Sequence, residues 1–354
     1  MIINAGELIA RCSRKALLKS TKAAMLFPWC VLVLLALSQE GRAEGAPVRG
    51  SNQPWQQILV LEGHSTEVQT VAWSPDGAQL ASGAEDSNLY VWSPDSGDLL
   101  RILPTEARLI ASLAWSPDGT QLASGAGGGA SNTIEIWDAQ IGKRIRILKD
   151  LVGWAFSIAW SPDGSVLMGS NGGGGISFWD NDTGALLRTL IGTPFTDYVW
   201  SVAWSPDGTQ FISGSGPFDH SVKVWDNASG TVIQTFRGHA TTVYSVAWSP
   251  NYAQVASGSG DRTIKIWDPI TGEVLQDISG NASSVLSVAF SPDGSQLTSG
   301  GLDGAVKIWD VASGQLQANL GDQVRPTYVV SWAPDGCRLA YGSGTLIQIW
   351  SQCQ

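Results

Sequence analysis

A short element, an aromatic residue followed by Ser-Pro-Asp-Gly, recurs seven times along the chain at intervals of 42 to 45 residues. The fifth copy is altered to WSPNY and the seventh to WAPDG. A second tryptophan closes an alternating run 18 to 22 residues after each copy starts. A fixed period of this length indicates that each repeat is one supersecondary unit, and that neighbouring units bury a shared core. The copies begin at Trp73, Trp115, Trp160, Trp204, Trp248, Phe290 and Trp332.

The residues of each unit predict strands joined by tight turns. Alternating runs rich in β-branched residues, such as SVKVWD at 221–226, are typical of strands. Ser-Pro-Asp-Gly favours a turn between two strands, since proline fixes φ and glycine accepts the left-handed conformation. No amphipathic pattern of helical length interrupts the repeats. The chain is therefore predicted to be all-β, with strands in a closed or radial array that leaves few exposed edges.

From Trp55 to Trp350 the repeats resemble the WD-repeat (WD40) family. The resemblance rests on the dipeptides Gly63-His64 and Gly238-His239, on the LASG or VASG strands and on the Trp-Asp that ends most units. It implies a seven-bladed WD40-type β-propeller of the exported bacterial type, spanning residues 55–354, with four antiparallel strands in each blade. In that family each repeat contributes the outer strand of one blade and the three inner strands of the next.

The two ends of the repeat region are complementary. The segment WQQILVLEG at 55–63 looks like an outer strand with no inner strands before it, and the last unit ends at Trp350 with no outer strand after it. We therefore predict that Gln56 to Leu61 pairs with Leu346 to Trp350. The first and last repeats would then share one blade and close the ring.

The N-terminus has the composition of an export signal. Basic residues up to Lys22 precede an apolar run at 23–37 that is shorter than a typical membrane span. Small-x-small sites ending at Ser38 and Ala43 follow it, and signal peptidase cleaves at sites of this kind. We expect an exported, periplasmic protein, and the alternatives are an uncleaved N-terminal membrane anchor or a cytosolic protein with a later start. The predicted segments are a signal peptide at 1–43 and a linker at 44–54.

Charge argues against nucleic acid as a partner. The formal net charge is −10, and the first 43 residues hold six basic and two acidic side chains, so the remainder carries −14. Binding to nucleic acid depends on neutralising phosphates with Lys and Arg, and an acidic body repels them. We therefore expect the protein to bind no nucleic acid. We also expect a monomeric propeller that contacts a membrane only if the N-terminal segment is uncleaved.

Two repeats contain the complete set of His, Ser, Asp and Trp that the family resemblance implies as a structural network. A Ser-His-Asp set is also the pattern of a serine hydrolase. Each serine here falls within a predicted buried strand, however, where a nucleophile is inaccessible and the polar groups must satisfy one another. We expect a structural role and no catalysis. The two sets are His64, Ser82, Asp86 and Trp92, and His239, Ser257, Asp261 and Trp267.

Cys337 and Cys353 flank a predicted hairpin with its turn near Gly344, which places them roughly opposite each other. In an oxidising compartment we expect a disulfide between them, worth about 3 kcal/mol in the chain-entropy model, with two unpaired thiols as the alternative. With three histidines and no close Cys/His cluster, the sequence offers no metal site and implies no cofactor. The glycine-rich stretches at 125–132 and 171–175 are interpreted as loose hairpin turns, since no lysine or helix start follows them.

A group of aromatic residues lies outside the repeat framework. In families that this chain resembles, the positions six and four residues before the motif aromatic face the mouth of the central channel. Aromatic side chains concentrate there in the third to fifth repeats, an arrangement typical of protein-binding hot spots and suited to stacking on a sugar. Extra packing around the channel is the alternative. The candidate partner-binding residues are Trp154, Phe156, Tyr198, Trp200, Tyr244 and Tyr328.

Three functions compete. The first is a non-catalytic scaffold that binds a protein partner on the channel-mouth face. The second is a propeller that binds a small ligand or carbohydrate at the same mouth. The third, an enzyme, has no nucleophile, base and oxyanion donors outside the structural positions. The fold alone does not decide among them, because propellers support many activities.

Overall fold

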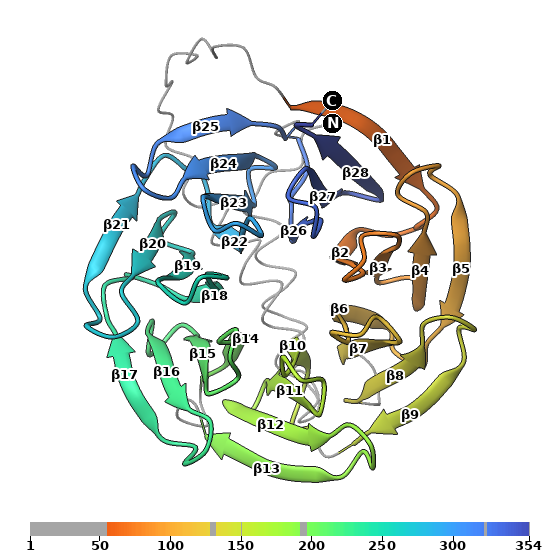
Figure 1. Cartoon of the computed structure of the whole chain (residues 1–354), viewed down its shortest axis with the longest axis horizontal. Coiled ribbons are helices and arrows are strands. Elements are labelled where there is room, and N and C mark those ends of the chain that lie inside the picture. The colour runs from red at the N-terminus through yellow and green to blue at the C-terminus, as the bar shows by residue number, and fades with distance from the viewer. Residues whose placement is uncertain (1–54, 128–131, 150, 192–196, 322–323, 354) are drawn as a thin grey trace, which may run out of the picture. The chain divides into compact units, whose positions relative to one another are not determined.

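The computed structural model describes residues 55–127, 132–149, 151–191, 197–321 and 324–353. Within these ranges the chain forms seven antiparallel four-stranded sheets around a ring (Figure 1). The predicted all-β, seven-bladed fold is therefore confirmed. Among the same residues no helix is long and apolar enough to cross a membrane. The predicted signal peptide and linker at 1–54 lie outside the described residues.

Six of the sheets, blades 1 to 6, are each built from four consecutive strands, with the first at the axis and the fourth at the rim (Figure 1). In chain order the strands are β2 (Val68–Trp73), β3 (Leu80–Ala84), β4 (Asn88–Trp92) and β5 (Leu99–Pro104); β6 (Leu109–Trp115), β7 (Gln121–Gly127), β8 (Ile134–Asp138) and β9 (Arg144–Leu148); β10 (Ala155–Trp160), β11 (Val166–Asn171), β12 (Gly175–Asp180) and β13 (Leu186–Ile191); β14 (Val199–Trp204), β15 (Gln210–Ser215), β16 (Val222–Asp226) and β17 (Val232–Phe236); β18 (Val243–Trp248), β19 (Val255–Ser259), β20 (Ile264–Trp267) and β21 (Val274–Ile278); β22 (Val285–Phe290), β23 (Gln296–Gly301), β24 (Val306–Asp310) and β25 (Leu316–Asn319).

Blade 7 is composite, since its strand order is β26 (Val330–Trp332), β27 (Arg338–Ser343), β28 (Leu346–Ser351) and then β1 (Gln56–Glu62). The antiparallel register between β1 and β28 runs from Gln56 opposite Ser351 to Glu62 opposite Leu346. This confirms the predicted closure of the ring by the two ends of the repeat region.

The apolar core lies between neighbouring blades. Leu89 and Val91 of blade 1, for example, belong to one buried cluster with Ile110 and Leu122 of blade 2. The middle strands are buried on both faces, whereas outer strands such as β5 expose most of their side chains to solvent. Each blade therefore depends on its neighbours for most of its apolar burial.

The recurring aromatic-Ser-Pro-Asp-Gly motif joins adjacent blades. The indole nitrogen of Trp115 donates to the Ala72 carbonyl of the preceding blade at 3.0 Å, and Trp160, Trp204 and Trp73 make the same bond to their own preceding blades. The turn glycine then faces the proline of the preceding turn, as at Gly119, where a Cβ would lie 3.6 Å from Pro75. In four of the seven copies both the tryptophan and the glycine therefore contact the blade before them.

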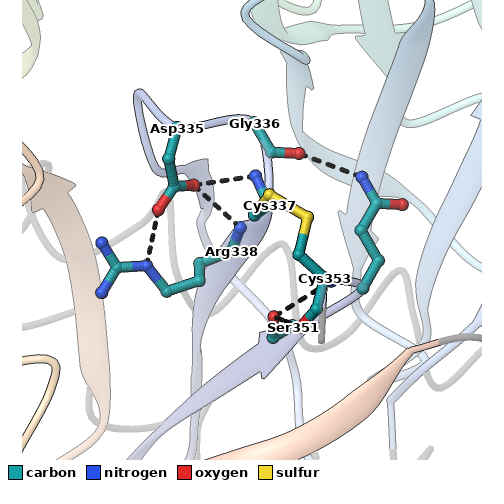
Figure 2. The surroundings of a disulfide bond; sticks show 7 residues. Asp335, Gly336, Cys337, Arg338, Ser351 and Cys353 are labelled. Atoms are coloured by element: carbon teal, nitrogen blue, oxygen red, sulfur yellow. Dashed lines mark hydrogen bonds and ion pairs between the residues drawn. A yellow bond between two sulfur atoms is a disulfide. The ribbon is translucent and has the colours of Figure 1, made fainter.

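The predicted cysteines are joined in a disulfide at the end of blade 7 (Figure 2). Cys337 immediately precedes β27 and Cys353 follows β28, with the two Cα atoms 5.4 Å apart. Beside it, the Arg338 guanidinium contacts Asp335 at 2.7 Å and Asp95 of blade 1 at 2.8 Å, and lies over the Trp73 ring. Blade 7 is thus held internally by strand pairing and a covalent bond, and Arg338 connects it to blade 1.

Candidate functional site

Five of the six candidate partner-binding residues form a continuous row of rings, here called the aromatic arc. They lie at or just before the start of the inner strands β10, β14 and β18, in blades 3 to 5. Consecutive rings are 4.5 to 6.0 Å apart between centroids, with mostly tilted or edge-to-face geometry. All five side chains are half-buried. The members are Trp154, Phe156, Tyr198, Trp200 and Tyr244.

Tyr328, the sixth candidate, lies apart from the arc. Its hydroxyl donates to Glu67 at the start of blade 1 at 3.2 Å. Burial, together with the nearby charges of Glu67 and Glu85, raises the pKa of the Tyr328 phenol well above its ordinary value. The loops from each outer strand to the next inner strand form one face, the channel-mouth face. It carries the arc in blades 3 to 5 and the contact between Tyr328 and Glu67 at blades 7 and 1.

Glycines make room for the arc. A Cβ on Gly127 would lie 3.2 Å from Trp154, and one on Gly260 would lie 3.2 Å from Tyr244. Gly172 faces Phe156 in the same way and donates its backbone N–H to the Trp154 carbonyl. The glycine-rich stretches, interpreted from sequence as loose hairpin turns, therefore include positions that let the rings pack against the neighbouring backbone.

One exposed aromatic residue beside the arc was missed by the sequence analysis. Phe218 lies in the loop between β15 and β16 and is 73% exposed. The buried carboxylate of Asp197 fixes this loop, because it accepts N–H groups from Phe218, Asp219 and Tyr198 at 2.8 to 3.4 Å. Burial raises the pKa of Asp197 in spite of these bonds. The only signal in the sequence is the added length of this hairpin, which does not specify the orientation of its aromatic side chain.

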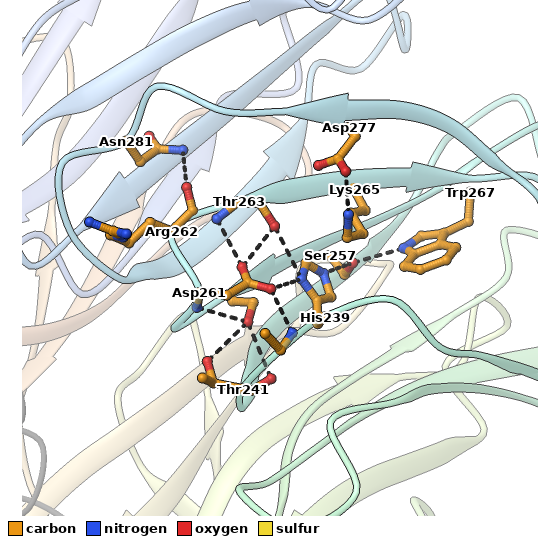
Figure 3. Close-up of polar contacts among 12 residues, drawn as sticks. His239, Thr241, Ser257, Asp261, Arg262, Thr263, Lys265, Trp267, Asp277 and Asn281 are labelled. Carbon is orange, nitrogen blue, oxygen red and sulfur yellow. Dashed lines mark hydrogen bonds and ion pairs between the residues drawn. The ribbon is translucent and has the colours of Figure 1, made fainter.

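The predicted polar network is complete in blade 5 (Figure 3). The Trp267 indole donates to Ser257 at 2.8 Å, and the His239 ring lies 2.7 Å from Ser257 through Nε2 and 2.9 Å from Asp261 through Nδ1. Although burial alone would raise the pKa of Asp261, hydrogen bonds from His239 and from the Ala240 backbone hold it well below its usual range.

Blade 1 repeats this arrangement with His64, Ser82, Asp86 and Trp92. Because Trp92 donates to the Ser82 oxygen, the serine proton is free to point at Nε2 of His64, and Nδ1 then carries the proton donated to Asp86. A neutral imidazole therefore satisfies every group. Burial lowers the pKa of His64 despite the nearby Asp86 carboxylate, in agreement with this assignment.

The other blades keep part of the network. Trp137, Trp225 and Trp309 each donate to the serine of the adjacent strand, at 2.9 to 3.2 Å. In blade 3 the serine position is Gly169, and the Trp179 indole instead donates to the Lys149 carbonyl. The tryptophan–serine bond is therefore the part of the network that most blades share.

The geometry of the two complete networks does not favour hydrolytic chemistry. Ser82 and Ser257 are fully buried, and each oxygen already accepts a tryptophan N–H. A substrate carbonyl would have no approach to either oxygen. Within the described part of the chain, no group of three His, Cys, Asp or Glu side chains is arranged to hold a metal ion.

These features define a repeat protein whose neighbouring blades contact one another through the aromatic-Ser-Pro-Asp-Gly motif. A family model described as "WD domain, G-beta repeat" matches five segments of the chain, which together cover more than half of it. The chain belongs to the WD40 family. The matched residues are 55–93, 97–138, 184–226, 230–268 and 272–310.

Curated relatives are similar over short stretches. The chain is 28% identical over 75 residues to "Protein HIRA" of Zea mays, covering 20% of this chain and 8% of that protein. It is 38% identical over 48 residues to a "Probable cytosolic iron-sulfur protein assembly protein 1" of Aspergillus flavus, covering 13% and 11%. It is 41% identical over 68 residues to "WD repeat-containing protein slp1" of Schizosaccharomyces pombe, covering 19% and 13%. The similarity to each is therefore confined to a small part of the relative's length.

Proposed function

We propose that the propeller is a non-catalytic scaffold that binds a protein partner on its channel-mouth face through the aromatic arc. The observation that carries this proposal is the continuous contact of five half-buried rings across three blades, with the exposed Phe218 beside them. Rigid aromatic clusters of this kind supply large contact areas at low entropic cost and are enriched in binding hot spots. Membership of the WD40 family supports a binding role, as does the burial of the two Ser-His-Asp sets.

The charged side chains at the channel mouth indicate what kind of partner segment would bind there. Glu67 and Glu85 are exposed near Tyr328, across the mouth from the arc. A partner segment with an apolar side chain for the arc and a basic group for these carboxylates would complement both sides.

Two further observations support an exported, periplasmic location for this scaffold. A disulfide such as Cys337–Cys353 forms and persists in oxidising compartments. The basic, then apolar, then small-residue order of the N-terminus is that of a bacterial signal peptide. Cell fractionation with mass spectrometry of the mature N-terminus tests this, and recovery of the intact chain in the cytosol with both thiols free would contradict it.

Co-purification from an envelope extract tests the binding proposal. We expect a defined protein to be retained by the wild type and lost when Trp200→Ala and Tyr244→Ala are combined, with the fold checked by thermal unfolding. The matched control is Ile141→Ser, which removes an exposed apolar side chain far from the arc and should retain the partner. The purified partner should then bind the wild type directly. Retention by the arc variant would overturn the proposal, and tryptophan quenching by glycans with no protein partner would favour carbohydrate binding instead.

A further inference from the structure

The opposite face of the propeller is lined by the Ser-Pro-Asp-Gly turns at the far ends of the inner strands, and it is here called the turn face. In blade 5, Tyr244 lies at the start of β18, whereas Asn251 and Tyr252 lie in the turn after its end. A strand of six residues extends about 20 Å. Any site at this turn is therefore separate from the aromatic arc.

The blade 5 turn differs from the others in charge and in side chain. Asn251 makes the contacts that the aspartate makes elsewhere, with Ser249 at 2.8 Å and the Ala253 N–H at 3.1 Å, but it carries no charge. Tyr252 occupies the position that is glycine in the other turns, at a backbone φ of 65° that residues with a side chain rarely adopt. Its ring is 45% exposed. The turn geometry is thus kept while a carboxylate is lost and an aromatic ring is presented.

A second apolar side chain is exposed on the same face of blade 5. Ile270, in the turn between β20 and β21, is 86% exposed, and the Asp268 carboxylate accepts the Ile270 and Thr271 N–H groups at 2.8 and 2.9 Å. The Gln234 side chain of blade 4 also donates to the Ile270 carbonyl. Ile270 is therefore held on a fixed backbone.

The two turns of blade 5 lie close together. In the register of this sheet Trp248 pairs with Val255, and Val255 with Trp267. The two turns therefore begin at the same end of the strands, and the strand ends from which they start, those of β18 and β20, are about 10 Å apart. In blade 6 a backbone bond joins the equivalent turns, from the Val311 N–H to the Ser295 carbonyl at 3.0 Å. Pro269 occupies that donor position in blade 5 and has no N–H to give.

The surroundings of this pair are acidic. The six turns of blades 4 to 6 on this face, all within the described residues, contain no lysine or arginine. Hydrogen bonds from the Ser205 and Ser291 hydroxyls lower the pKa of Asp207 and of Asp293, which flank the blade 5 turn. The acidic residues of these turns are Asp207, Asp226, Asp268, Glu273, Asp293 and Asp310.

We propose that Tyr252 and Ile270 form a second docking site on the turn face, for an extended protein segment that carries an apolar side chain between lysine or arginine residues. The apolar side chain packs on Tyr252 and Ile270. The turn that holds Tyr252 is the one turn between a first and a second strand in blades 4 to 6 that lacks a carboxylate. The basic residues reach the carboxylates of blades 4 and 6 on either side. The same charge pattern disfavours anionic lipid and nucleic acid as occupants of this face.

A displayed random-peptide library tests the site on the full-length, disulfide-bonded protein. Peptides are selected on the wild type and depleted on a variant that combines Tyr252→Gly with Ile270→Ser, and selected peptides are titrated by calorimetry. Glycine fits the φ of this turn, so Tyr252→Gly should fold normally. We expect the selected peptides to carry an aromatic or aliphatic residue between basic ones. Each single substitution should weaken their binding by about tenfold, the effect of one hot-spot side chain.

The matched control is Ile141→Ser, an exposed isoleucine 70% accessible in the corresponding turn of blade 2, and it should leave peptide affinity unchanged. The combination of Trp200→Ala and Tyr244→Ala should also bind the peptides normally, whatever it does to the channel-mouth partner. The proposal is overturned if no peptide is enriched or if the enriched peptides lack basic residues. It is overturned too if Tyr252→Gly binds like the wild type, or if Ile141→Ser or the arc variant loses the peptides to the same extent.

Discussion

In blade 5 the Trp267 indole donates to the buried Ser257, whereas in blade 7 the Trp350 indole donates to the side chain of Gln348. Blade 7 has Tyr341 at the serine position, and the Tyr341 hydroxyl donates to the same glutamine at 2.8 Å. Blade 7 is also the blade made from both ends of the repeat region and the one that contains the disulfide. A four-stranded blade is therefore held by a histidine-centred network in blade 5, and by a disulfide and the pairing of β1 with β28 in blade 7.

Because of this difference, the blades should be destabilised by different chemical conditions. A network built around a neutral buried imidazole weakens when acid protonates its members. A blade held by a disulfide weakens under reductant, and one completed by a separate strand weakens when that strand is removed. Blade 7 should thus respond to truncation and reduction, blade 5 to changes in its polar side chains, and blade 1 to such changes and also to pH through His64.

Deletion of residues 1–62 should have the largest effect. It removes β1 and leaves the edge of β28 unpaired over the full register from Gln56 to Glu62. The deletion exposes a strand edge that can pair with other molecules, so we expect loss of the soluble monomer in light scattering coupled to gel filtration. Deletion of residues 1–43 is the control and should leave a monomer. A monomeric, cooperatively unfolding product of the longer deletion would show that the ring does not need this strand.

Loss of the disulfide should come next. The combination of Cys337→Ser and Cys353→Ser opens a loop with a sequence separation of 16, which in the chain-entropy model costs about 3 kcal/mol. Urea unfolding should show this loss, and dithiothreitol should lower the wild type to the same value while leaving the variant unchanged. Hydrogen exchange should accelerate in β27 and β28 more than in β19 and β20. Equal acceleration in both pairs of strands would remove the distinction between the two blades.

Ser257→Ala should destabilise by about 2 kcal/mol, because it leaves the Trp267 N–H and the His239 Nε2 buried without partners. Tyr341→Phe is the matched change in blade 7 and should cost about 1 kcal/mol, since it removes one hydroxyl. Urea unfolding of both variants measures the difference. A larger loss for Tyr341→Phe would mean that the glutamine-centred arrangement is as important to its blade as the histidine network is to blade 5.

The parts that the sequence predicted are those set by the repeat itself. The period determines the number of blades, and the unmatched strand at 55–63 implies its pairing with β28. The family resemblance implied the grouping of His239, Ser257 and Asp261, and the structure places Ser257 in β19, His239 in the loop before β18 and Asp261 in the loop after β19. The first two inferences depend on local order along the chain, which sequence patterns describe well.

The parts that were missed arise between repeats or in loops. The bond from Trp115 to the Ala72 carbonyl joins two units, and no pattern within one unit specifies it. The orientation of Phe218 depends on the buried Asp197, which lies in a different loop. The departure of the WSPNY copy from the repeat is visible in the sequence, but only the structure shows the φ of Tyr252 in that turn and the exposure of Ile270 in the next turn on the same face.

Acidification should weaken blade 1, which shares the network of blade 5, before it affects blade 7. Burial lowers the pKa of His64, so below about pH 6.5 the unfolded chain takes up a proton that the folded chain does not. The free energy of unfolding should therefore fall as the pH drops from 7 to 5, by no more than about 1.4 kcal/mol per pH unit for this proton. His64→Gln should reduce that slope in urea titrations. An unchanged slope would indicate that His64 has the same pKa in the folded and unfolded chains.

Tyr252→Gly should have the smallest effect and the opposite sign. The φ of 65° at Tyr252 is unfavourable for a residue with a Cβ, whereas Gly164 holds the equivalent position in blade 3 at 73°. Glycine should relieve this strain and raise the free energy of unfolding by up to about 1 kcal/mol, offset in part by the greater entropy of the unfolded chain. Gly164→Tyr, the reciprocal change, should lower it by a similar amount. Glycine would then be the more stable residue in this turn. A gain in stability together with a loss of peptide binding would mean that Tyr252 serves recognition at the expense of the fold. Unchanged or lower stability would mean that the tyrosine ring itself supports the turn.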